Sequence, residues 1–248
     1  MIWDQLTTEE TKKINKELPV VLLLCATEQH GPHLPLSTDR LIGEHFIQEL
    51  NKQAEKGFIW LPTIPVGCSE HHMDFSGTLT FSHTVFKAII EEMVKCMIVH
   101  GFKNFLFINS HGGNQGIGQV ILEALGNQHH GCHFSLVTWW KLATQELKDV
   151  NKSGPGGTGH AGEFETSLML HISPDLVRLD KITPVSEQKF DPLVGDMITP
   201  PSFSYFQTIK NISANGVVGN PSFSSKEKGK KISQIITSKL VDIITNLS

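Results

Sequence analysis

Short apolar runs alternate along the chain with longer segments in which apolar residues recur at helical spacing. Four runs predict strands: 19–26, 57–66, 104–109 and 133–139. The first is continuously apolar, as is typical of a strand buried on both faces, and the second is broken by proline. Helical spacing predicts helices over 39–51, 82–100, 113–128, 141–150, 161–172 and 226–247. Strands that alternate with helices imply βαβ units, so we expect an α/β fold with a mostly parallel sheet covered on both faces.

The chain is interpreted as a single domain over residues 1–248, because no internal repeat or linker divides it. Residues 183–221 are irregular and rich in Pro, Ser, Phe and Asn. This segment is compatible with a lid, a contact between protomers or a surface excursion, and the sequence leaves these three open.

Composition removes several classes of function. The 248 residues carry 21 Lys+Arg and 25 Asp+Glu, so a net charge of -4 gives no electrostatic reason to expect nucleic acid or an anionic membrane as a partner. No run approaches the ~18–20 apolar residues that span a bilayer, and the first residues lack the apolar core of a signal peptide. The four cysteines are widely spaced without a CxxC pair, which favours a reducing compartment and a cytoplasmic protein.

Polar residues follow the predicted strands, at the edge of a parallel sheet where binding sites form. After strand 19–26, Glu28 and His30 lie two residues apart, so an extended backbone directs both side chains to the same side. A turn at Gly31 can return the chain so that Asp39, at the start of the next helix, joins them. Two carboxylates and an imidazole suit a divalent cation such as Zn²⁺ or Mn²⁺. Asp39 taken alone is equally compatible with a helix N-cap.

Two further motifs sit in similar places. Ser-His-Gly-Gly-Asn follows strand 104–109, and its glycines permit a bound group to approach closely beside His111, although a structural turn is as plausible as a ligand. His160 and Glu163 lie three residues apart where a helix opens, so they share a helix face and suit one acid/base group and one ligand. The alternative is that Glu163 or Glu165 caps that helix.

A polar segment at 69–78 is interpreted as a loop on the substrate side of the site, with Ser69 and Glu70 as candidate substrate contacts. His71 and His72 are adjacent, so both cannot face one site if the backbone is extended. The chain contains 13 histidines, and those outside the motifs are interpreted as structural or exposed.

Taken together, the motifs resemble those of the creatininase family of creatinine amidohydrolases. The resemblance rests on Glu-Gln-His-Gly-Pro-His-Leu-Pro-Leu with its following Asp, on Asn-Ser-His-Gly-Gly-Asn, on His-Ala-Gly-Glu-Phe-Glu-Thr-Ser-Leu-Met-Leu, and on the stretches 74–80 and 216–222. It covers about residues 19–230. It implies a three-layer α/β/α sandwich and hydrolysis of a non-peptide C–N bond in a small cyclic amide or formamide. It also implies two divalent metal ions per chain, Zn²⁺ or Mn²⁺ with Fe²⁺ as an alternative.

The resemblance also implies roles for individual residues. Glu28 and His111 would hold one metal, His30 would hold the other, and Asp39 would bridge the pair. A water or hydroxide bridging the two metals would then attack the amide carbonyl. His160 matches the family's catalytic histidine and would contact the substrate and move a proton to the leaving nitrogen.

Two departures from creatininase proper change these expectations. The glutamate that creatininase carries two residues after its counterpart of His111 is Gly113 here, so we expect Glu163 to complete the shell of the second metal, or to act as acid/base if it is not a ligand. The tryptophan and acidic residue before the catalytic histidine are replaced by Gly156–Gly159. An aromatic wall over creatinine is therefore missing or supplied from elsewhere, and creatinine itself is a doubtful substrate.

Several alternatives remain at this stage. Formamides of flavin and pterin biosynthesis and a peptide-derived cofactor precursor are further substrate classes of similar proteins. A single-metal hydrolase using Glu28, His30 and His111, and a binding protein that keeps the fold without chemistry, are the competing interpretations. The resemblance also implies a homo-oligomer, commonly a hexamer, with residues 200–207 as a candidate contact surface.

Overall fold

A four-stranded sheet forms the centre of the protein. The computed structural model describes residues 1–55, 57–182, 195–201, 203 and 205–247. Within them, the strand order is β2-β1-β3-β4 and every neighbouring pair is parallel. The strands are β1 (Val20–Leu24), β2 (Ile59–Trp60), β3 (Asn104–Asn109) and β4 (His133–Thr138). This confirms the predicted α/β fold with a parallel sheet.

β2 is much shorter than the apolar run at 57–66 from which it was predicted. It ends at Trp60, and Pro62 and Pro65 follow. Because proline has no N–H to donate to a strand ladder, regular pairing stops there. Beyond Trp60, the N–H of Leu61 still donates to the carbonyl of Val21 at 3.0 Å, and an isolated bridge joins Leu24 and Ile64.

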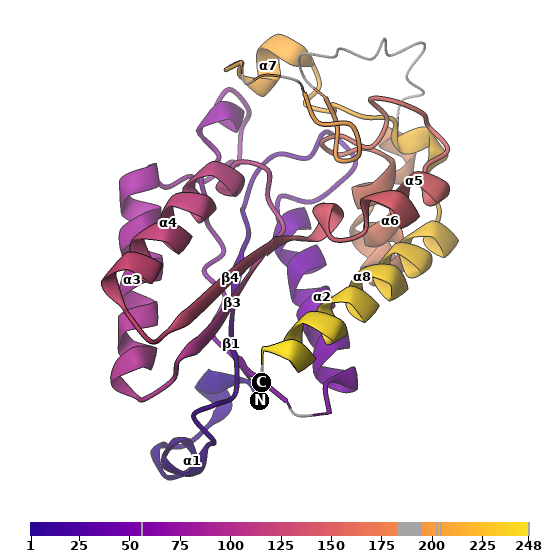
Figure 1. Cartoon of the computed structure of the whole chain (residues 1–248). Coiled ribbons are helices and arrows are strands. Elements are labelled where there is room, and N and C mark those ends of the chain that lie inside the picture. The colour runs from indigo at the N-terminus through magenta and orange to yellow at the C-terminus, as the bar shows by residue number, and fades with distance from the viewer. Residues whose placement is uncertain (56, 183–194, 202, 204, 248) are drawn as a thin grey trace.

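Helices cover both faces of the sheet (Figure 1). α2 (Thr38–Gln53), α6 (Glu163–Ile172) and α8 (Lys226–Asn246) pack against one another on one side, and α3 (His83–Val99) and α4 (Asn114–Gln128) lie on the other. The three layers agree with the α/β/α sandwich that the family resemblance implies. The six predicted long helices are all present, with bounds within a few residues of the expected ones, except that α5 (Thr144–Val150) begins three residues late.

The central strands are apolar along their whole length because both of their faces are covered. In β1, Val21 and Leu23 belong to the core cluster under α2 and α8, whereas Val20, Leu22 and Leu24 belong to the cluster under α3 and α4. Successive side chains of a strand point to opposite faces, so one continuous apolar run supplies both cores.

Short elements complete the described part of the chain. They are α1 (Thr8–Lys13), α7 (Ile209–Ile212), η1 (Trp3–Gln5), η2 (Glu70–His72), η3 (Trp139–Lys141), η4 (Pro174–Leu176), η5 (Leu179–Lys181) and η6 (Pro221–Phe223). Hydrophobic periodicity did not predict them, because a helix of one or two turns contains too few residues to show a period. Among the described residues, no helix is both long enough and apolar enough to cross a membrane.

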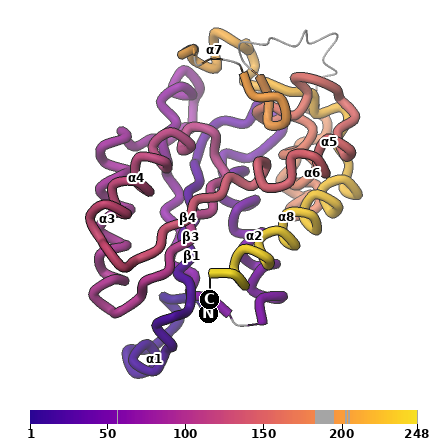
Figure 2. The backbone as a smooth tube through the Cα atoms, in the orientation of Figure 1, coloured from indigo at the N-terminus to yellow at the C-terminus, as the bar shows by residue number. Residues whose placement is uncertain are grey.

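The two chain termini lie close together at the end of the sheet where the strands begin (Figure 2). The Met1 ammonium donates to the carbonyl of Phe58 at 2.7 Å, which ties the N-terminus to the start of β2. The loops that follow β1, β3 and β4 gather at the opposite end. Part of the segment predicted as a lid or contact surface, residues 183–194, 202 and 204, lies outside the described residues.

Candidate metal centre

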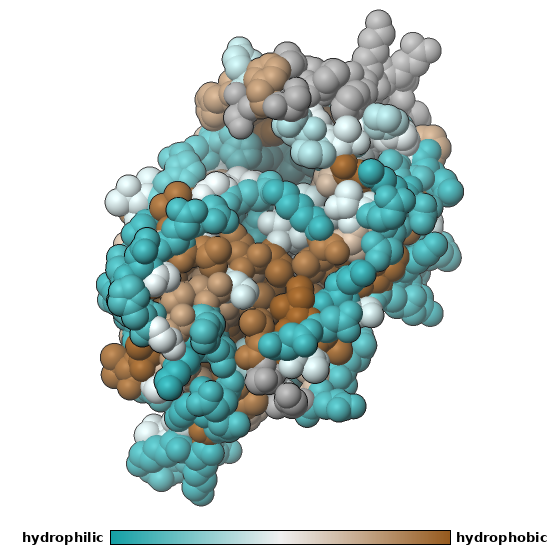
Figure 3. All heavy atoms as spheres, in the orientation of Figure 1, coloured by the Kyte–Doolittle hydropathy of each residue, from teal (hydrophilic) through white to brown (hydrophobic). Residues whose placement is uncertain are grey.

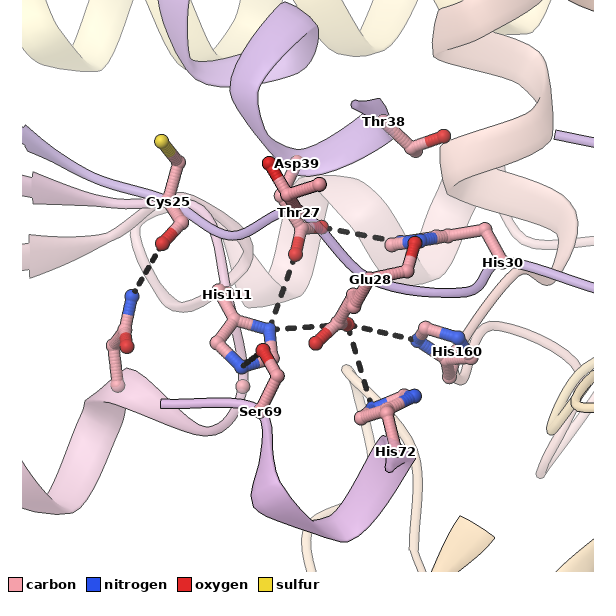
Figure 4. A network of polar contacts seen from close by, with 12 residues as sticks. Cys25, Thr27, Glu28, His30, Thr38, Asp39, Ser69, His72, His111 and His160 are labelled. Carbon is pink, nitrogen blue, oxygen red and sulfur yellow. Dashed lines mark hydrogen bonds and ion pairs between the residues drawn. The ribbon is translucent and has the colours of Figure 1, made fainter. Parts of the chain in front are cut away.

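Glu28, Asp39 and His111 meet at the carboxyl ends of β1 and β3. Glu28 lies in the loop after β1, Asp39 in the first turn of α2, and His111 in the loop after β3. Nδ1 of His111 lies 3.2 Å from Oε1 of Glu28 and 3.1 Å from Oδ2 of Asp39 (Figure 4). All three side chains are buried. The structure thus brings together three of the residues that the sequence analysis selected.

A second group of ligand atoms lies next to the first. Nε2 of His30 is 3.2 Å from Oδ1 of Asp39 and 3.8 Å from Oε2 of Glu165. The ring of His160 lies beside that of His30, with centroids 4.2 Å apart. Because Asp39 presents Oδ2 to His111 and Oδ1 to His30, its carboxylate stands between the two groups, as a bridging ligand would.

Backbone carbonyls orient the imidazoles. Each ring uses one nitrogen toward a carbonyl oxygen, namely Nδ1 of His30 to Glu28 at 3.2 Å, Nε2 of His111 to Cys68 at 3.0 Å, and Nε2 of His160 to Gln29 at 2.7 Å. A carbonyl oxygen only accepts, so each of these nitrogens carries the hydrogen. The other nitrogen of each ring faces the carboxylates, and metal-binding histidines are held in this way.

The buried polar atoms of the cluster lie near one another, but several of them make no hydrogen bond. Within the described chain, both carboxylate oxygens of Glu28, Oδ2 of Asp39 and Nε2 of His30 are buried without a hydrogen-bond partner. Such atoms cost free energy unless a partner compensates them. A divalent cation in each group would satisfy all of them, and a set of carboxylates and imidazoles is a donor set that Zn²⁺ and Mn²⁺ accept. The residues present therefore fit two metal ions.

The electrostatics of the cluster support the same conclusion. Burial lowers the pKa of His30, but the charges of Asp39 and Glu165 outweigh it and raise this pKa to about 10. Burial likewise opposes protonation of His111, yet Glu28 and Asp39 raise its pKa well above the usual value. Burial is also the largest influence on Glu165 and raises its pKa to about 7. Protons occupy the positions that cations would take, because three crowded carboxylates attract positive charge.

Gln29 contacts both His72 and His160 and so links His72 to the cluster. Its side-chain amide donates to Nδ1 of His72 at 2.9 Å and to the carbonyl of Gly216 at 3.1 Å. His72 therefore accepts at Nδ1 and carries its hydrogen on Nε2, which lies 3.4 Å from Oε1 of Glu28. Burial lowers the pKa of His72. His160 also approaches this oxygen, with Nδ1 at 3.7 Å.

Glu163 lies outside the cluster, which does not agree with its expected role as a ligand or as an acid/base. Its buried carboxylate accepts from the backbone N–H of Lys152 at 3.1 Å and of Ser153 at 2.8 Å. It also pairs with Nζ of Lys228 at 2.5 Å. Glu163 thus ties the glycine-rich segment before His160 to α6 and α8.

Glu165 takes the place that was expected for Glu163. Its Oε2 accepts from the backbone N–H of Ala161 at 2.7 Å and faces His30. Residues two apart on a helix point in directions about 200° apart, so only one of these glutamates can face the site. The sequence analysis identified the helix that presents a carboxylate but selected Glu163, whereas Glu165 is the glutamate that faces His30.

The segment 69–78 contributes different residues from those expected. Oγ of Ser69 lies 3.3 Å from Nε2 of His111, so Ser69 supports a metal-facing ring and does not line the cavity over the site. Glu70 is exposed and lies 3.9 Å from Nδ1 of His83. His71 and His72 both approach the site because they belong to η2, where about 120° separates successive residues, and not to an extended strand.

A cavity of about 690 Å³ opens over the cluster. Its inner wall includes Glu28, Asp39, His111, His160 and Glu165. Its outer wall is mostly apolar and includes Trp140, Met197, Ile198, Pro200, Pro201 and Ile209. Cavities of about 300–1,000 Å³ hold ligands of the size of a drug molecule, so this one has room for more than a small ring.

Comparisons with known proteins identify the family of the chain. The family model described as Creatininase: Creatinine amidohydrolase matches residues 4–244. A mycofactocin precursor peptide peptidase of Mycolicibacterium smegmatis is 27% identical over 232 residues, which cover 92% of this chain and 85% of that protein. A creatinine amidohydrolase of Pseudomonas putida is 22% identical over 239 residues, covering 91% and 88% of the two chains.

Solved structures share the fold. One described as Creatininase Mn superposes with a TM-score of 0.79 at 20% identity, covering 99% of this chain and 97% of that one. A mutant creatininase of the Zn-Zn type superposes with a TM-score of 0.77 at 21% identity and the same coverage. At this level of identity, the likeness concerns the fold.

Proposed function

The chain belongs to the creatininase family of hydrolases, and from this premise we propose that it is an amidohydrolase whose active site is a centre of two divalent metal ions. The observation that carries the proposal is the position of Asp39, whose two carboxylate oxygens face His30 on one side and His111 on the other. The unsatisfied buried atoms around it support the presence of cations.

Two sets of residues are proposed to hold the ions. Glu28, Asp39 and His111 would form one set, and their ligand atoms lie within 4.8 Å of one another. His30, Asp39 and Glu165 would form the other, because Nε2 of His30 lies 3.2 Å from Asp39 and 3.8 Å from Glu165. His160 lies beside them, and its ligand atom is within 4.8 Å of those of His30 and Glu165. Zn²⁺ and Mn²⁺ are the proposed ions, with Fe²⁺ as an alternative. Two divalent cations bound there supply an activated water and polarise the carbonyl of an amide.

The chain's own residues prepare this chemistry. The carboxylates of Glu28, Asp39 and Glu165 carry three negative charges, which offset most of the charge of two divalent ions in a buried site. His160 lines the cavity and has only Nδ1 available, because Nε2 donates to the carbonyl of Gln29. We propose that His160 contacts the substrate through Nδ1 and moves the proton that the leaving nitrogen requires.

The proposed substrate is a small cyclic amide or a formamide, and a peptide-derived amide is the second candidate. The cavity of about 690 Å³ and its apolar outer wall favour a substrate with an apolar extension over creatinine itself. Gly159, from the segment 156–159, lines this cavity without a side chain, whereas Trp140 supplies an aromatic face at another point of the wall. The relatives described as peptide peptidases support the second candidate.

The proposal is tested by elemental analysis of the purified protein together with hydrolysis of a panel of cyclic amides, formamides and short peptides. We expect two equivalents of metal per chain and hydrolysis of one of these classes that stops when the metal is chelated. Full activity with one equivalent would favour the single-metal hydrolase instead. Two bound metals without turnover of any member would favour the binding protein.

We also propose a homo-oligomer, for which a hexamer is the expected size. β4 is an edge strand of the described sheet, and apolar side chains gather on the face that Figure 3 shows between α4 and α8. Partly buried Phe134, Leu136 and Val137 come from this strand. An uncovered apolar face of this kind is typical of an interface. Sedimentation velocity measures the assembly, and a monomer at micromolar concentration would contradict it.

The four cysteines are free thiols in the structure. This supports the proposed reducing, cytoplasmic location. A thiol titration of protein prepared without reductant checks it, and protein that arrives with disulfides would contradict it.

A further inference from the structure

His71 is an imidazole of the cavity that the proposed metal centre does not use. It lies in η2 and lines the cavity, and its ring stacks on that of His111 with centroids 5.8 Å apart and an angle of 18° between the planes. Within the described residues, neither of its ring nitrogens makes a hydrogen bond or an ion pair. His71 therefore brings two free polar atoms to the edge of the cluster.

The other imidazoles of the site are already committed. Each has one nitrogen held by a carbonyl or an amide while the other faces a carboxylate, as in His30, His72, His111 and His160. These contacts set the orientation of each ring, and His160 is proposed to use its Nδ1 in that orientation. Among the described residues that line the cavity, His71 is the histidine with neither ring nitrogen engaged.

Gly113 explains why the ring of His71 can lie flat against His111. A Cβ at position 113 would stand 2.8 Å from Cε1 of His71, 2.5 Å from Nε2 of His111 and 2.2 Å from the carbonyl oxygen of Cys68. Any side chain there would collide with both rings and with the backbone. The glycine leaves this part of the wall to His71.

His71 is suited to donate a hydrogen bond into the cavity, because its ring lines the cavity and is held only by stacking on His111. A neutral imidazole has one N–H donor and one acceptor nitrogen. Its partial exposure lets that donor reach a ligand in the cavity.

We propose that His71 is a substrate-contacting residue whose ring N–H donates to the oxygen of the scissile amide. Negative charge develops on this oxygen when the carbonyl carbon is attacked, and a donor aimed at it in a water-poor site stabilises the transition state. The inference rests on the proposed amidohydrolase function, and it adds to that function a residue outside both sets of metal ligands.

The test compares His71→Ala and His71→Gln with the wild type. His130→Ala is the matched control, because His130 is an exposed histidine in the turn before β4, at the opposite end of the sheet. The probe is acetohydroxamate, a small amide analogue whose two oxygens bind divalent metals, and its affinity for the metal-loaded protein is measured by calorimetry. Elemental analysis reports the metal content of each variant, and circular dichroism reports folding.

We expect His71→Ala to keep both metals and to bind acetohydroxamate about tenfold more weakly than the wild type. On any amide that the wild type hydrolyses, we expect kcat to fall about 100-fold with a smaller change in KM. His71→Gln retains an N–H donor and is expected to recover most of the affinity, and His130→Ala is expected to behave as the wild type. Loss of a metal in His71→Ala would make His71 a ligand and overturn the proposal. Unchanged affinity for the hydroxamate would overturn it as well. A wild type that binds the hydroxamate through His71 but hydrolyses nothing would refute the proposed function and leave the contact standing.

Discussion

Glu163 and Glu165 stand two residues apart at the start of α6, and changing each to glutamine is expected to shift the stability of the metal-free protein in opposite directions. The substitutions are chemically identical, since each removes one negative charge and keeps one acceptor oxygen. What differs is the surroundings of the two carboxylates. Glu163 has cationic and N–H partners for both oxygens, whereas Glu165 is buried beside other acids.

For Glu163→Gln we expect a loss of about 2–4 kcal/mol in the free energy of unfolding. Breaking a buried ion pair costs about 3–5 kcal/mol when the remaining charge stays buried. The side chain of Lys228 is 20% exposed, so its ammonium can partly recover hydration, and glutamine still accepts from one N–H. A loss of about 3 kcal/mol corresponds to a Tm lower by about 6–12 °C for a chain of this length.

For Glu165→Gln we expect a gain of up to about 3 kcal/mol in the metal-free protein. Burial is the largest influence that raises the pKa of Glu165 to about 7 from a usual value of 4.5. Each pKa unit corresponds to about 1.4 kcal/mol, so the ionised carboxylate lowers the free energy of unfolding by about 3 kcal/mol at pH 7.5. Neutral glutamine removes this cost and can still accept from the N–H of Ala161. The metal-loaded protein should respond in the opposite sense, because a ligand is lost.

The assay is thermal unfolding at pH 7.5 after chelation, repeated during titration with Zn²⁺ or Mn²⁺. The metal-free Glu163→Gln variant should have a lower Tm than the metal-free wild type, and metal should raise its Tm by as much as that of the wild type. The metal-free Glu165→Gln variant should have a Tm equal to or above that of the wild type, and metal should raise its Tm by less. Shifts of the same sign in the two metal-free variants, or a normal metal response of Glu165→Gln, would refute the assignment of the two glutamates.

Three further predictions concern the centre and its wall. Asp39→Ala should lose both metals and the activity together, and full activity with two retained metals, measured by elemental analysis and turnover, would contradict the bridging role. In metal-free protein, the raised pKa of His30 contributes stability that is fully present below about pH 6.5 and is lost as pH rises through about 10. Chemical unfolding should therefore show a free energy of unfolding that falls over this pH range. Metal affinity should rise over the same range, because His30 must lose its proton to bind a metal. Gly113→Ala places a Cβ 2.2 Å from the carbonyl oxygen of Cys68, so it should lower the free energy of unfolding by about 1–3 kcal/mol. It should also weaken acetohydroxamate binding as His71→Ala does. Unchanged binding would show that Gly113 does not set the position of His71.

Much of the fold follows from local pattern. The runs at 104–109 and 133–139 became β3 and β4 nearly residue for residue. β3 is buried along almost its whole length, whereas β4 is only partly buried at the edge of the sheet. α3 ends just before Gly101, which adopts a φ of 95° that favours glycine and stops the helix. The length of β2 depended on Pro62 and Pro65, whose effect on pairing appears only once the neighbouring strand is known.

The proposed metal ligands also divide into those that the local sequence indicated and those that only the tertiary structure decided. Glu28 and His30 were accessible from the sequence because their spacing and their place after a buried strand restrict where they point. The sequence analysis selected Glu163 instead of Glu165. It placed His71 and His72 in a loop on the substrate side, where both could not face one site if the backbone were extended. The choice between the two glutamates depends on the rotation of α6, and the placement of the histidines depends on the turn of η2.

By itself, the sequence determined that the protein has a parallel sheet and that carboxylates and imidazoles collect where its strands end, because these properties follow from periodicity and from the order of the elements. Only the tertiary structure decided which of those side chains meet. The packing of α6 against α2 and α8 sets its rotation about its own axis, and that rotation turns Glu165 toward His30 and Glu163 toward Lys228. Contacts between residues far apart in the chain fix such rotations, and no local pattern encodes them.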